Sequence, residues 1–418
     1  MKRLIALLIA VLTVLSCAVS AFAEERIEME RPLITNANMA VLYEDTTDTW
    51  MYLKNENVTN APASMTKVMT ATLLLDYDPE MKGTTTVSAN AISNKYCYWL
   101  DDVHLEEGEE CSVKDLMHYL LICSGNEAAT TLAEYVAGDI DVFIGMMNDR
   151  AKELGMERTH YYDPHGLSDD SRTTCSDMIK LCKFAMENYP QIVEITSTKS
   201  GAMPVSNKRT KPLRYSTTNR VMNPGGNPMY ETGFDQDIIG IKTGSTTVAG
   251  LNLSCCMVHD DLKFYSVVMH AKSAKDEYGT EYSGHHADTA SLMKWARSFK
   301  KVGTEAGTVV ATMATKGSKE PNVTVKTAES VYILAQTDVE PDMEFFEIGE
   351  KVEAGDVVGK LTYTDEFENV RSTDLIAESA AETPVAFPFI PMICMSAIAA
   401  VIAFTVTRKK LAKQHRNI

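Results

Sequence analysis

The chain has 418 residues, of which 45% are hydrophobic and 23% are charged, and its formal net charge is −17 at pH 7. A chain of this length can bury a core without the help of disulfide bonds. An acidic surface is poorly suited to nucleic acid or anionic lipid, so the composition argues against a nucleic-acid-binding protein.

Residues 1–23 have the pattern of a secretory signal peptide. Basic residues precede a long apolar run, and Ala21-Phe-Ala23 ends the run with small residues, as a cleavage site requires. Cys17 is an alternative site of lipid modification, but Leu15 is an awkward residue two places before it. Cleavage after Ala23 explains the segment better, and we expect the residues that follow to be exported.

Two short β-prone runs, residues 40–44 and 49–54, flank a polar turn and predict a hairpin. The next segment reads Ala61-Pro-Ala-Ser-Met-Thr-Lys67 and continues with apolar residues at helical intervals. Ser64 and Lys67 are three residues apart, close to one helical turn, so their side chains would share a face. Taken alone, so short a pattern is more often a helix start with a solvated lysine than a site.

Hydrophobic periodicity predicts a block of helices that is followed by strands. The expected helices are residues 65–77, 113–123, 127–136, 139–154, 176–188 and 288–299, and the expected strands are residues 238–242, 251–259 and 262–270. With the early hairpin, strands stand on both sides of the helical block. This order predicts an α/β domain of the α+β kind over residues 24–300, with an antiparallel sheet closed by both ends of the segment.

The pattern changes from about residue 301, where short runs rich in Val and Thr replace the helices. These runs are residues 308–312, 323–325, 331–334 and the glycine-punctuated 352–361. They predict a small all-β domain over residues 301–375, followed by a linker over residues 376–384.

The apolar run over residues 385–407 has about the 20 residues that a helix needs to cross a membrane. Residues 408–418 are basic, and basic residues prefer the cytoplasmic side. A buried core helix is the alternative, but the prolines near the start of the run and the basic terminus fit an anchor better. We therefore expect a transmembrane helix that tethers an exported domain.

The cysteines and histidines form no metal-binding pattern. Seven cysteines fall in the predicted exported part: Cys97, Cys111, Cys123, Cys175, Cys182, Cys255 and Cys256. An odd number cannot pair completely within one chain, so we expect mostly buried free thiols. The adjacent His285 and His286 are expected in a polar loop rather than as ligands. We predict neither a metal nor a cofactor.

Two further motifs accompany Ser64 and Lys67. Ser124-Gly-Asn126 follows a predicted helix, where a turn would present both polar side chains, and Lys242-Thr-Gly244 ends a strand at the edge of the predicted sheet. Each motif is weak alone, because Ser-Gly-Asn is by default a turn and Lys-Thr-Gly is by default a strand end.

Together, and in this order, the three motifs resemble those of the penicillin-binding enzymes and serine β-lactamases. Further stretches are similar to the D-alanyl-D-alanine carboxypeptidases, the low-molecular-mass penicillin-binding proteins of the S11 serine peptidase family. These stretches are residues 62–67, 105–109, 113–116, 147–148, 154–155, 163–167 and 242–250. The resemblance covers nearly the whole chain and implies a β-lactamase/transpeptidase-like fold. The chain departs from the family pattern in the turn at residues 45–50, where the family has a glycine and this sequence has none.

The residues themselves suggest how such a site would work. A serine hydroxyl is a weak nucleophile and needs a base within hydrogen-bond reach. No Ser-His-Asp set stands out, so Lys67 is the candidate base for Ser64. An exposed lysine is protonated at neutral pH, but partial burial and a second cation at Lys242 would disfavour the charged form. We therefore expect a neutral Lys67 that takes the Ser64 proton.

The resemblance implies the roles of the other residues around the nucleophile. Ser124 would relay the proton to the departing amine, and Asn126 would bond the substrate backbone. The backbone N–H groups of Ser64 and Ser245 would form the oxyanion hole.

The resemblance also implies the substrate and its place. Lys242 and Thr243 would hold a terminal carboxylate, while Gly244 lets the substrate lie along the sheet edge as an added strand. The implied activity is removal of the terminal D-alanine from peptidoglycan stem peptides through an acyl-enzyme on Ser64, outside the bacterial cell membrane. A β-lactam would mimic the terminal dipeptide and trap Ser64 covalently.

The same three motifs also occur in proteins with other functions. A class A β-lactamase would carry a Glu-x-x-Leu-Asn segment, and none occurs between Ser124 and Lys242. A transpeptidase differs only in using an amine in place of water, which the motifs do not decide. A β-lactam sensor would need a cytoplasmic signalling module, and an inactive scaffold would be expected to have lost a catalytic residue.

Overall fold

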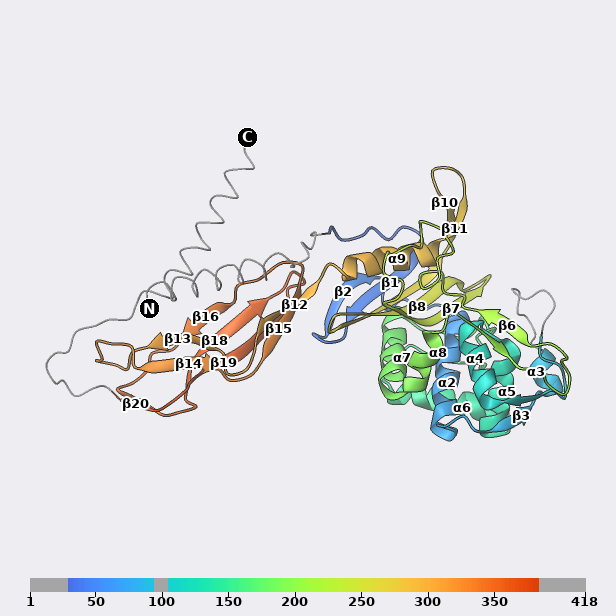
Figure 1. Ribbon diagram of the computed structural model, residues 1–418, viewed down its shortest axis with the longest axis horizontal. Coiled ribbons are helices and arrows are strands. Elements are labelled where there is room, and N and C mark those ends of the chain that lie inside the picture. Colours follow the sequence, from blue (N-terminus) through green and yellow to red (C-terminus); the bar gives the residue numbers. More distant parts are fainter. Residues whose placement is uncertain (1–28, 94–103, 383–418) are drawn as a thin grey trace, which may run out of the picture. The chain divides into compact units, whose positions relative to one another are not determined.

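The computed structural model describes residues 29–93 and 104–382 (Figure 1). The predicted signal peptide, the predicted anchor over residues 385–407, the basic tail and Cys97 lie outside the described residues. Within the described ranges, no helix combines the length and apolar character that crossing a membrane would require.

An antiparallel five-stranded sheet with the order β2-β1-β9-β8-β7 forms the centre of the first part of the chain. Its strands are β1 (Ala37–Glu44), β2 (Thr49–Lys54), β7 (Ile238–Thr246), β8 (Gly250–His259) and β9 (Leu262–Ala271). The hairpin and the later strands thus meet in one sheet, as the sequence predicted. Strand β7 is an edge strand, which matters for the site.

Both faces of this sheet are buried, and the strands alternate between two cores. On β1, Val41 and Tyr43 belong to one hydrophobic cluster, whereas Ala40 and Leu42 belong to the other. This is the period of two that a strand imposes on its side chains. The result is a three-layer arrangement, with helices on each face (Figure 1).

The larger helical layer holds the helices predicted between residues 65 and 188, together with two short helices that the sequence did not predict. It contains α2 (Lys67–Tyr77), α3 (Ala89–Ser93), α4 (Val113–Ile122), α5 (Asn126–Ala137), α6 (Ile140–Glu153), α7 (Cys175–Asn188) and α8 (Pro190–Thr196). Local signals define several ends: the side chains of Ser112, Asp139 and Thr174 accept backbone N–H groups at the starts of α4, α6 and α7. Two short antiparallel strand pairs lie between or after these helices in the chain. They are β3 (Thr84–Thr86) with β4 (Glu110–Ser112), and β5 (Ser200–Met203) with β6 (Leu213–Ser216).

Helix α9 (Gly284–Ala296) covers the opposite face and corrects one expectation. His285 and His286 lie in its first turn and are buried, so the prediction of a polar loop is wrong. Their rings pack against each other with centroids 3.8 Å apart, and His286 also meets the ring of Tyr230. Burial lowers the pKa of His285 to about 3 and that of His286 well below its usual value, so both rings are neutral and pack as apolar groups.

The early hairpin turns without the glycine that the resemblance suggested. Asp48 takes the left-handed conformation with φ +51°, and Tyr43 donates a 2.8 Å hydrogen bond to its carboxylate. The fully buried Glu44 accepts the backbone N–H groups of Thr46 and Thr47 at 2.8 and 2.7 Å. Aspartate tolerates this backbone region better than most residues, so it replaces glycine here.

The described residues that follow α9 form strands and no helix, as predicted for the small β domain. Strand β12 (Lys300–Thr304) pairs with β15 (Val331–Ala335), and a second sheet has the order β13 (Val309–Met313), β14 (Val323–Thr327), β19 (Val370–Ala377), β18 (Val357–Thr364) and β16 (Asp342–Phe345). Two further short pairs are β17 (Lys351–Val352) with β20 (Ala381–Glu382), and β10 (Ser273–Lys275) with β11 (Glu281–Ser283) before α9.

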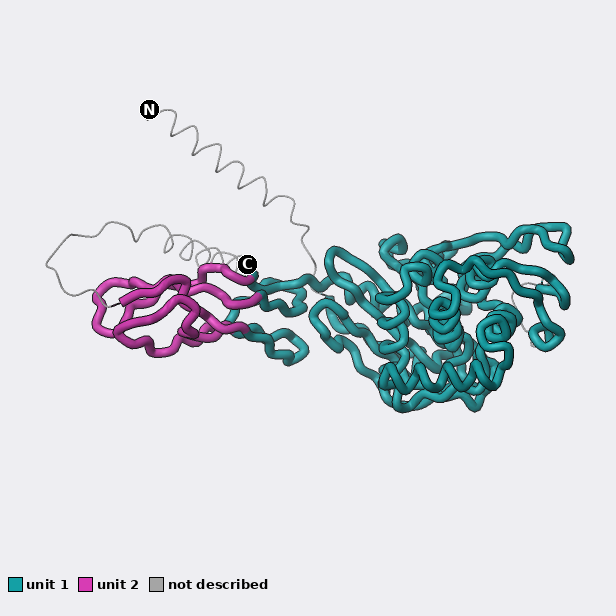
Figure 2. The backbone as a smooth tube through the Cα atoms, turned by 90° about the horizontal axis from the view of Figure 1, so that it is seen from below, with its two compact units in different colours: residues 1–305, 330–342, 362–372 teal, residues 306–329, 343–361, 373–418 magenta. Residues whose placement is uncertain are grey.

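The chain forms two compact units, coloured separately in Figure 2. One contains the described residues up to Glu305 together with Ser330–Asp342 and Thr362–Ser372, and the other contains Ala306–Glu329, Met343–Leu361 and the described residues from Thr373. The chain therefore passes between the units more than once. All residues of the three motifs belong to the first unit.

The described cysteines are buried. Cys111, Cys123, Cys175, Cys182, Cys255 and Cys256 form no disulfide bond with one another. Burial raises the pKa of Cys111, Cys182 and Cys255 to about 12 in each case. These thiols behave as small hydrophobic side chains, as the sequence predicted.

Candidate active site

Ser64 and Lys67 lie where a short 3-10 helix, η1 (Ala63–Thr66), becomes α2. The tight turn brings Lys67 Nζ within 2.8 Å of Ser64 Oγ. Ser64 is partly exposed, whereas Lys67 is completely buried. The structure therefore presents a reachable hydroxyl whose neighbouring amine is shielded from water, and the interpretation of Lys67 as a solvated helix residue is wrong.

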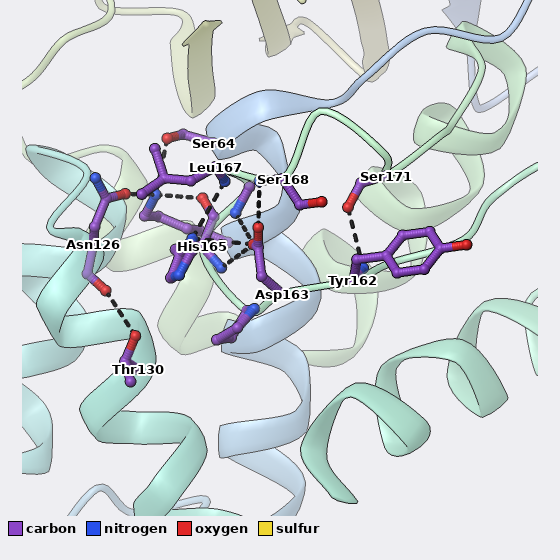
Figure 3. Close-up of polar contacts among 12 residues, drawn as sticks. Ser64, Asn126, Thr130, Tyr162, Asp163, His165, Leu167, Ser168 and Ser171 are labelled. Atoms are coloured by element: carbon purple, nitrogen blue, oxygen red, sulfur yellow. Dashed lines mark hydrogen bonds and ion pairs between the residues drawn. The ribbon is translucent and has the colours of Figure 1, made fainter. Parts of the chain in front are cut away.

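Two further oxygen atoms contact the buried amine, each from a different part of the chain. Lys67 Nζ donates to Asn126 Oδ1 at 2.7 Å and to the backbone carbonyl of His165 at 2.6 Å. Figure 3 shows Ser64, Asn126 and His165 around this point. The amine is thus held between the helical layer and a loop that lies between α6 and α7.

The Ser-Gly-Asn motif forms the turn between α4 and α5. Ser124 is partly exposed and has φ +72°, which is an uncommon conformation for a residue with a side chain. At Gly125 a Cβ atom would lie 2.4 Å from the Tyr119 ring, so only glycine fits. Asn126 begins α5 and is 3% exposed, with its amide oxygen on Lys67.

The Lys-Thr-Gly motif lies on the edge strand β7, directly beside the nucleophile. Lys242 is buried, and its Nζ donates to the carbonyl of Thr243 at 2.9 Å. The hydroxyl of Thr243 contacts the hydroxyl of Thr218. Ser245 is exposed at the same edge. The outer side of β7 carries no strand within the described residues, so it offers backbone groups to an extended ligand.

Close backbone packing joins β7 to the serine turn. A Cβ atom at Gly244 would lie 2.9 Å from the carbonyl oxygen of Pro62 and 3.0 Å from the nitrogen of Ser64. The two backbones that would supply the expected oxyanion-hole donors are therefore in direct contact. One region therefore contains residues of all three motifs: Ser64, Lys67, Asn126, Lys242, Thr243 and Gly244. Ser124 lies in the turn just before Asn126, and Ser245 follows Gly244 on β7.

Sequence reasoning did not assign the loop at residues 163–168 to the site. Its contribution is made by backbone: the His165 carbonyl contacts Lys67, and Gly166, at φ +87°, leaves no room for a Cβ because the carbonyl oxygen of Ala63 lies 1.8 Å from that position. The Asp-Pro-x-Gly composition indicates a turn but does not reveal this contact. In the described part of the chain, no group of three or more His, Cys, Asp or Glu side chains could hold a metal ion.

The fold resembles that of several solved structures. The D-alanyl-D-alanine carboxypeptidase DacD from Francisella tularensis has a TM-score of 0.61 at 21% identity, over 87% of this chain and 98% of that one. The Streptomyces K15 DD-transpeptidase has a TM-score of 0.54 at 22% identity, over 64% of this chain and 98% of that one. At these identities the likeness concerns the fold.

Sequence comparisons give the family. The Peptidase_S11 family model, described as D-alanyl-D-alanine carboxypeptidase, matches residues 26–273. The D-alanyl-D-alanine carboxypeptidase DacF of Bacillus subtilis is 28% identical over 92% of this chain and 94% of its own length. The carboxypeptidase DacD of Escherichia coli is 30% identical over 68% of this chain and 72% of its own length. The chain therefore belongs to the S11 family of serine peptidases, the D-alanyl-D-alanine carboxypeptidases.

Proposed function

We propose that the protein removes the terminal D-alanine from peptidoglycan stem peptides through an acyl-enzyme on Ser64. The observation that carries this proposal is the 2.8 Å contact between the partly exposed Ser64 hydroxyl and the fully buried Lys67 amine. A nucleophile of this kind needs a base within hydrogen-bond reach, and Lys67 is in reach.

Lys67 acts as the base in its neutral form. A neutral amine has two N–H donors and one lone pair, so one of its three oxygen neighbours must donate to Nζ. Of Ser64 Oγ, Asn126 Oδ1 and the His165 carbonyl, only the Ser64 hydroxyl carries a proton, so in the neutral form the lone pair accepts from Ser64 and the two N–H donors go to the other two oxygens. Complete burial favours the same form, because water cannot solvate an ammonium group there. Lys67 then takes the Ser64 proton as attack begins.

The substrate lies along the free edge of β7. Lys242 and Thr243 bind its terminal carboxylate, and Asn126 binds its backbone. The N–H groups of Ser64 and Ser245 stabilise the oxyanion, and the packing of Gly244 on the Ser64 turn supports their closeness. In this proposal the scissile carbonyl lies over Ser64 Oγ.

Each step conserves atoms and protons. Ser64 Oγ attacks the carbonyl carbon of the penultimate D-alanine while its proton passes to Lys67. Collapse of the tetrahedral intermediate breaks the C–N bond, and the proton reaches the leaving amine through Ser124. Water then attacks the ester, which releases the shortened peptide and restores Ser64. With a β-lactam, the amide bond of the ring opens instead, and the ester remains on Ser64.

The enzyme works outside the cytoplasm, with residues 24–300 as the peptidase domain and residues 301–375 as the small β domain. The proposed signal peptide and the apolar run at residues 385–407 support export and a single-pass membrane anchor. Peptidoglycan, the substrate, lies in that compartment, so the role is in cell-wall biogenesis.

Transfer to an amine is the competing reaction, because the Streptomyces K15 relative in fold is a DD-transpeptidase. The test supplies the purified protein with a peptide ending in D-alanyl-D-alanine, with and without an acceptor amine, and measures free D-alanine and transfer product. Hydrolysis without the acceptor, and its loss in Ser64→Ala, are expected. Equal D-alanine release by Ser64→Ala would overturn the proposal.

A further inference from the structure

The carboxylate of Asp163 organises the loop that contacts Lys67. Asp163 Oδ1 accepts the backbone N–H of His165 at 2.9 Å and that of Gly166, and Oδ2 accepts the backbone N–H of Ser168. His165 Nδ1 lies 3.1 Å from Oδ1. Figure 3 shows these contacts converging on one side chain.

The charged form of Asp163 is strongly favoured. Burial alone would raise its pKa, but the bond from the His165 ring and the N–H groups of Gly166 and Ser168 lower the pKa to about 2. His165 Nδ1 is also 3.2 Å from the N–H of Leu167, and one nitrogen cannot donate to a carboxylate and accept from an amide at once. The bond to the charged carboxylate is the stronger one.

The carbonyl groups of the same loop are bound by α2. The His165 carbonyl accepts from Lys67 Nζ at 2.6 Å, and the Pro164 carbonyl accepts from Thr70 Oγ1 at 2.6 Å. Lys67 and Thr70 lie one turn apart on α2. The loop is therefore held from two directions, by one carboxylate on its N–H groups and by α2 on its carbonyl groups.

The loop also touches the backbone of the nucleophile. At Gly166 a Cβ atom would lie 1.8 Å from the carbonyl oxygen of Ala63 and 2.9 Å from the nitrogen of Ser64. Any shift of this glycine would press on the turn that carries Ser64, because no free space separates them. The N–H that Asp163 binds at Gly166 thus belongs to a residue in contact with the proposed nucleophile.

We infer that Asp163 is a positioning residue for the acylation step. It acts through two backbone groups: the His165 carbonyl, which orients the Lys67 amine toward Ser64 Oγ, and Gly166, which supports the Ser64 turn. The inference rests on the proposed function of Lys67 as the base. Misplacing a catalytic group by about 1 Å can cost roughly 100-fold in rate, so loss of the carboxylate is expected to slow acylation by that order.

The test compares Asp163→Ala, Asp163→Asn and wild type, using a fluorescent penicillin and the full-length protein. Asparagine retains an oxygen that can accept the N–H groups of His165 and Gly166. Its NH₂ group, however, would face the backbone N–H of Ser168, and two donors cannot form a hydrogen bond. Asp170→Ala is the matched control, because Asp170 lies exposed in the same loop. The acylation rate at saturating penicillin is measured separately from the final labelled fraction, which reports how much protein is folded.

Asp163→Ala is expected to be labelled completely but roughly 100-fold more slowly at saturation, with the half-saturating concentration little changed. Asp163→Asn should recover part of the rate, and Asp170→Ala should match wild type. A reduced labelled fraction with an unchanged rate would overturn the inference, because it would mean that Asp163 only stabilises the fold. If Asp163→Ala does not fold, a wild-type rate in Asp163→Asn overturns it equally.

The parallel variants separate this inference from the proposed function. If Ser64→Ala is still labelled, or Lys67→Met is acylated at the wild-type rate, the proposed function fails. If both lose acylation while Asp163→Ala keeps the wild-type rate, only the role of Asp163 is wrong.

Discussion

Gly244 of β7 lies against the backbone nitrogen of Ser64 so closely that a Cβ atom at residue 244 would be 3.0 Å from it. The carbonyl oxygen of Pro62 would be 2.9 Å away, and the nitrogen of Met65 would be 3.1 Å away. All three are backbone atoms, which cannot rotate aside as a flexible side chain can. The edge strand and the serine turn are therefore fitted to each other at this glycine.

Gly244→Ala is expected to slow acylation by roughly 100-fold, because the strand or the turn must move by several tenths of an ångström. Penicillin labelling under single-turnover conditions measures the rate, and thermal unfolding measures the stability. Gly145→Ala in α6 is the matched control, since a Cβ there meets nothing within 4 Å. That change should stabilise the helix by about 0.5–1 kcal/mol. A wild-type rate in Gly244→Ala would contradict the fitted arrangement.

Lys67 can be tested with two variants that differ in what they preserve. Lys67→Met removes the base and should lower the acylation rate by about 100- to 10,000-fold. Lys67→Arg keeps N–H donors at this position, but a guanidinium group cannot be deprotonated in a protein and so cannot serve as the base, and the rate should stay low. The measurement is the saturating acylation rate. Arginine activity within about threefold of wild type would show that a neutral amine is not required.

The contacts among Ser64, Lys67 and Asn126 could be predicted because they are made by side chains, whose types are visible in the sequence. Each motif has recognisable residue types at a fixed spacing. The helical patterns placed the first two motifs at helix ends, as observed, whereas Lys242-Thr-Gly244 was expected to end a strand and lies inside β7, which continues to Thr246. The two β-prone runs around a polar turn likewise predicted a hairpin, and β1 and β2 pair as one. That alternate residues of β1 enter two different cores was learned from the structure.

The contribution of residues 163–168 could not be predicted in the same way. The His165 carbonyl and the Gly166 backbone act through atoms that every residue possesses, so no side-chain type identifies them. His285 and His286 were missed for a different reason. Histidine is common in polar loops, and only the structure reveals that these two rings are buried, packed against each other and, for His286, against Tyr230.

A buried ion pair gives a stability prediction away from the nucleophile. Arg209 Nε donates to Glu109 Oε1 at 2.6 Å, and the side chains are 8% and 0% exposed. Arg209→Ala would leave the Glu109 carboxylate buried without its partner, which costs about 3–5 kcal/mol of unfolding free energy. Urea unfolding measures the loss. Arg214→Ala, at an exposed position on β6, should change the free energy by less than about 0.5 kcal/mol. A similarly small change in Arg209→Ala would show that the pair is not structurally important.

His285 gives the protein an acid sensitivity whose direction follows from its pKa. Burial lowers the pKa of His285 from 6.5 to about 3. Between pH 6.5 and pH 3, therefore, His285 binds a proton in the unfolded chain but not in the folded chain. Unfolding is therefore favoured as the pH falls below 6.5, and the full stability of the neutral ring is present only above it. Between pH 7 and 5 the loss should be about 2 kcal/mol for His285 alone. His286, whose pKa is also lowered by burial, adds to the loss in the same direction.

His285→Leu should make this dependence less steep and leave the part that His286 contributes, because leucine fills the same apolar site without a proton to bind. The measurement is urea unfolding at pH 7 and at pH 5 for wild type, His285→Leu and His160→Gln, since His160 is exposed. The His160 variant should keep the wild-type slope. Asp163, whose pKa is lowered from 3.8 to about 2, contributes only below about pH 4 and does not disturb the comparison. An unchanged slope in His285→Leu would mean that the ring is not buried as a neutral group.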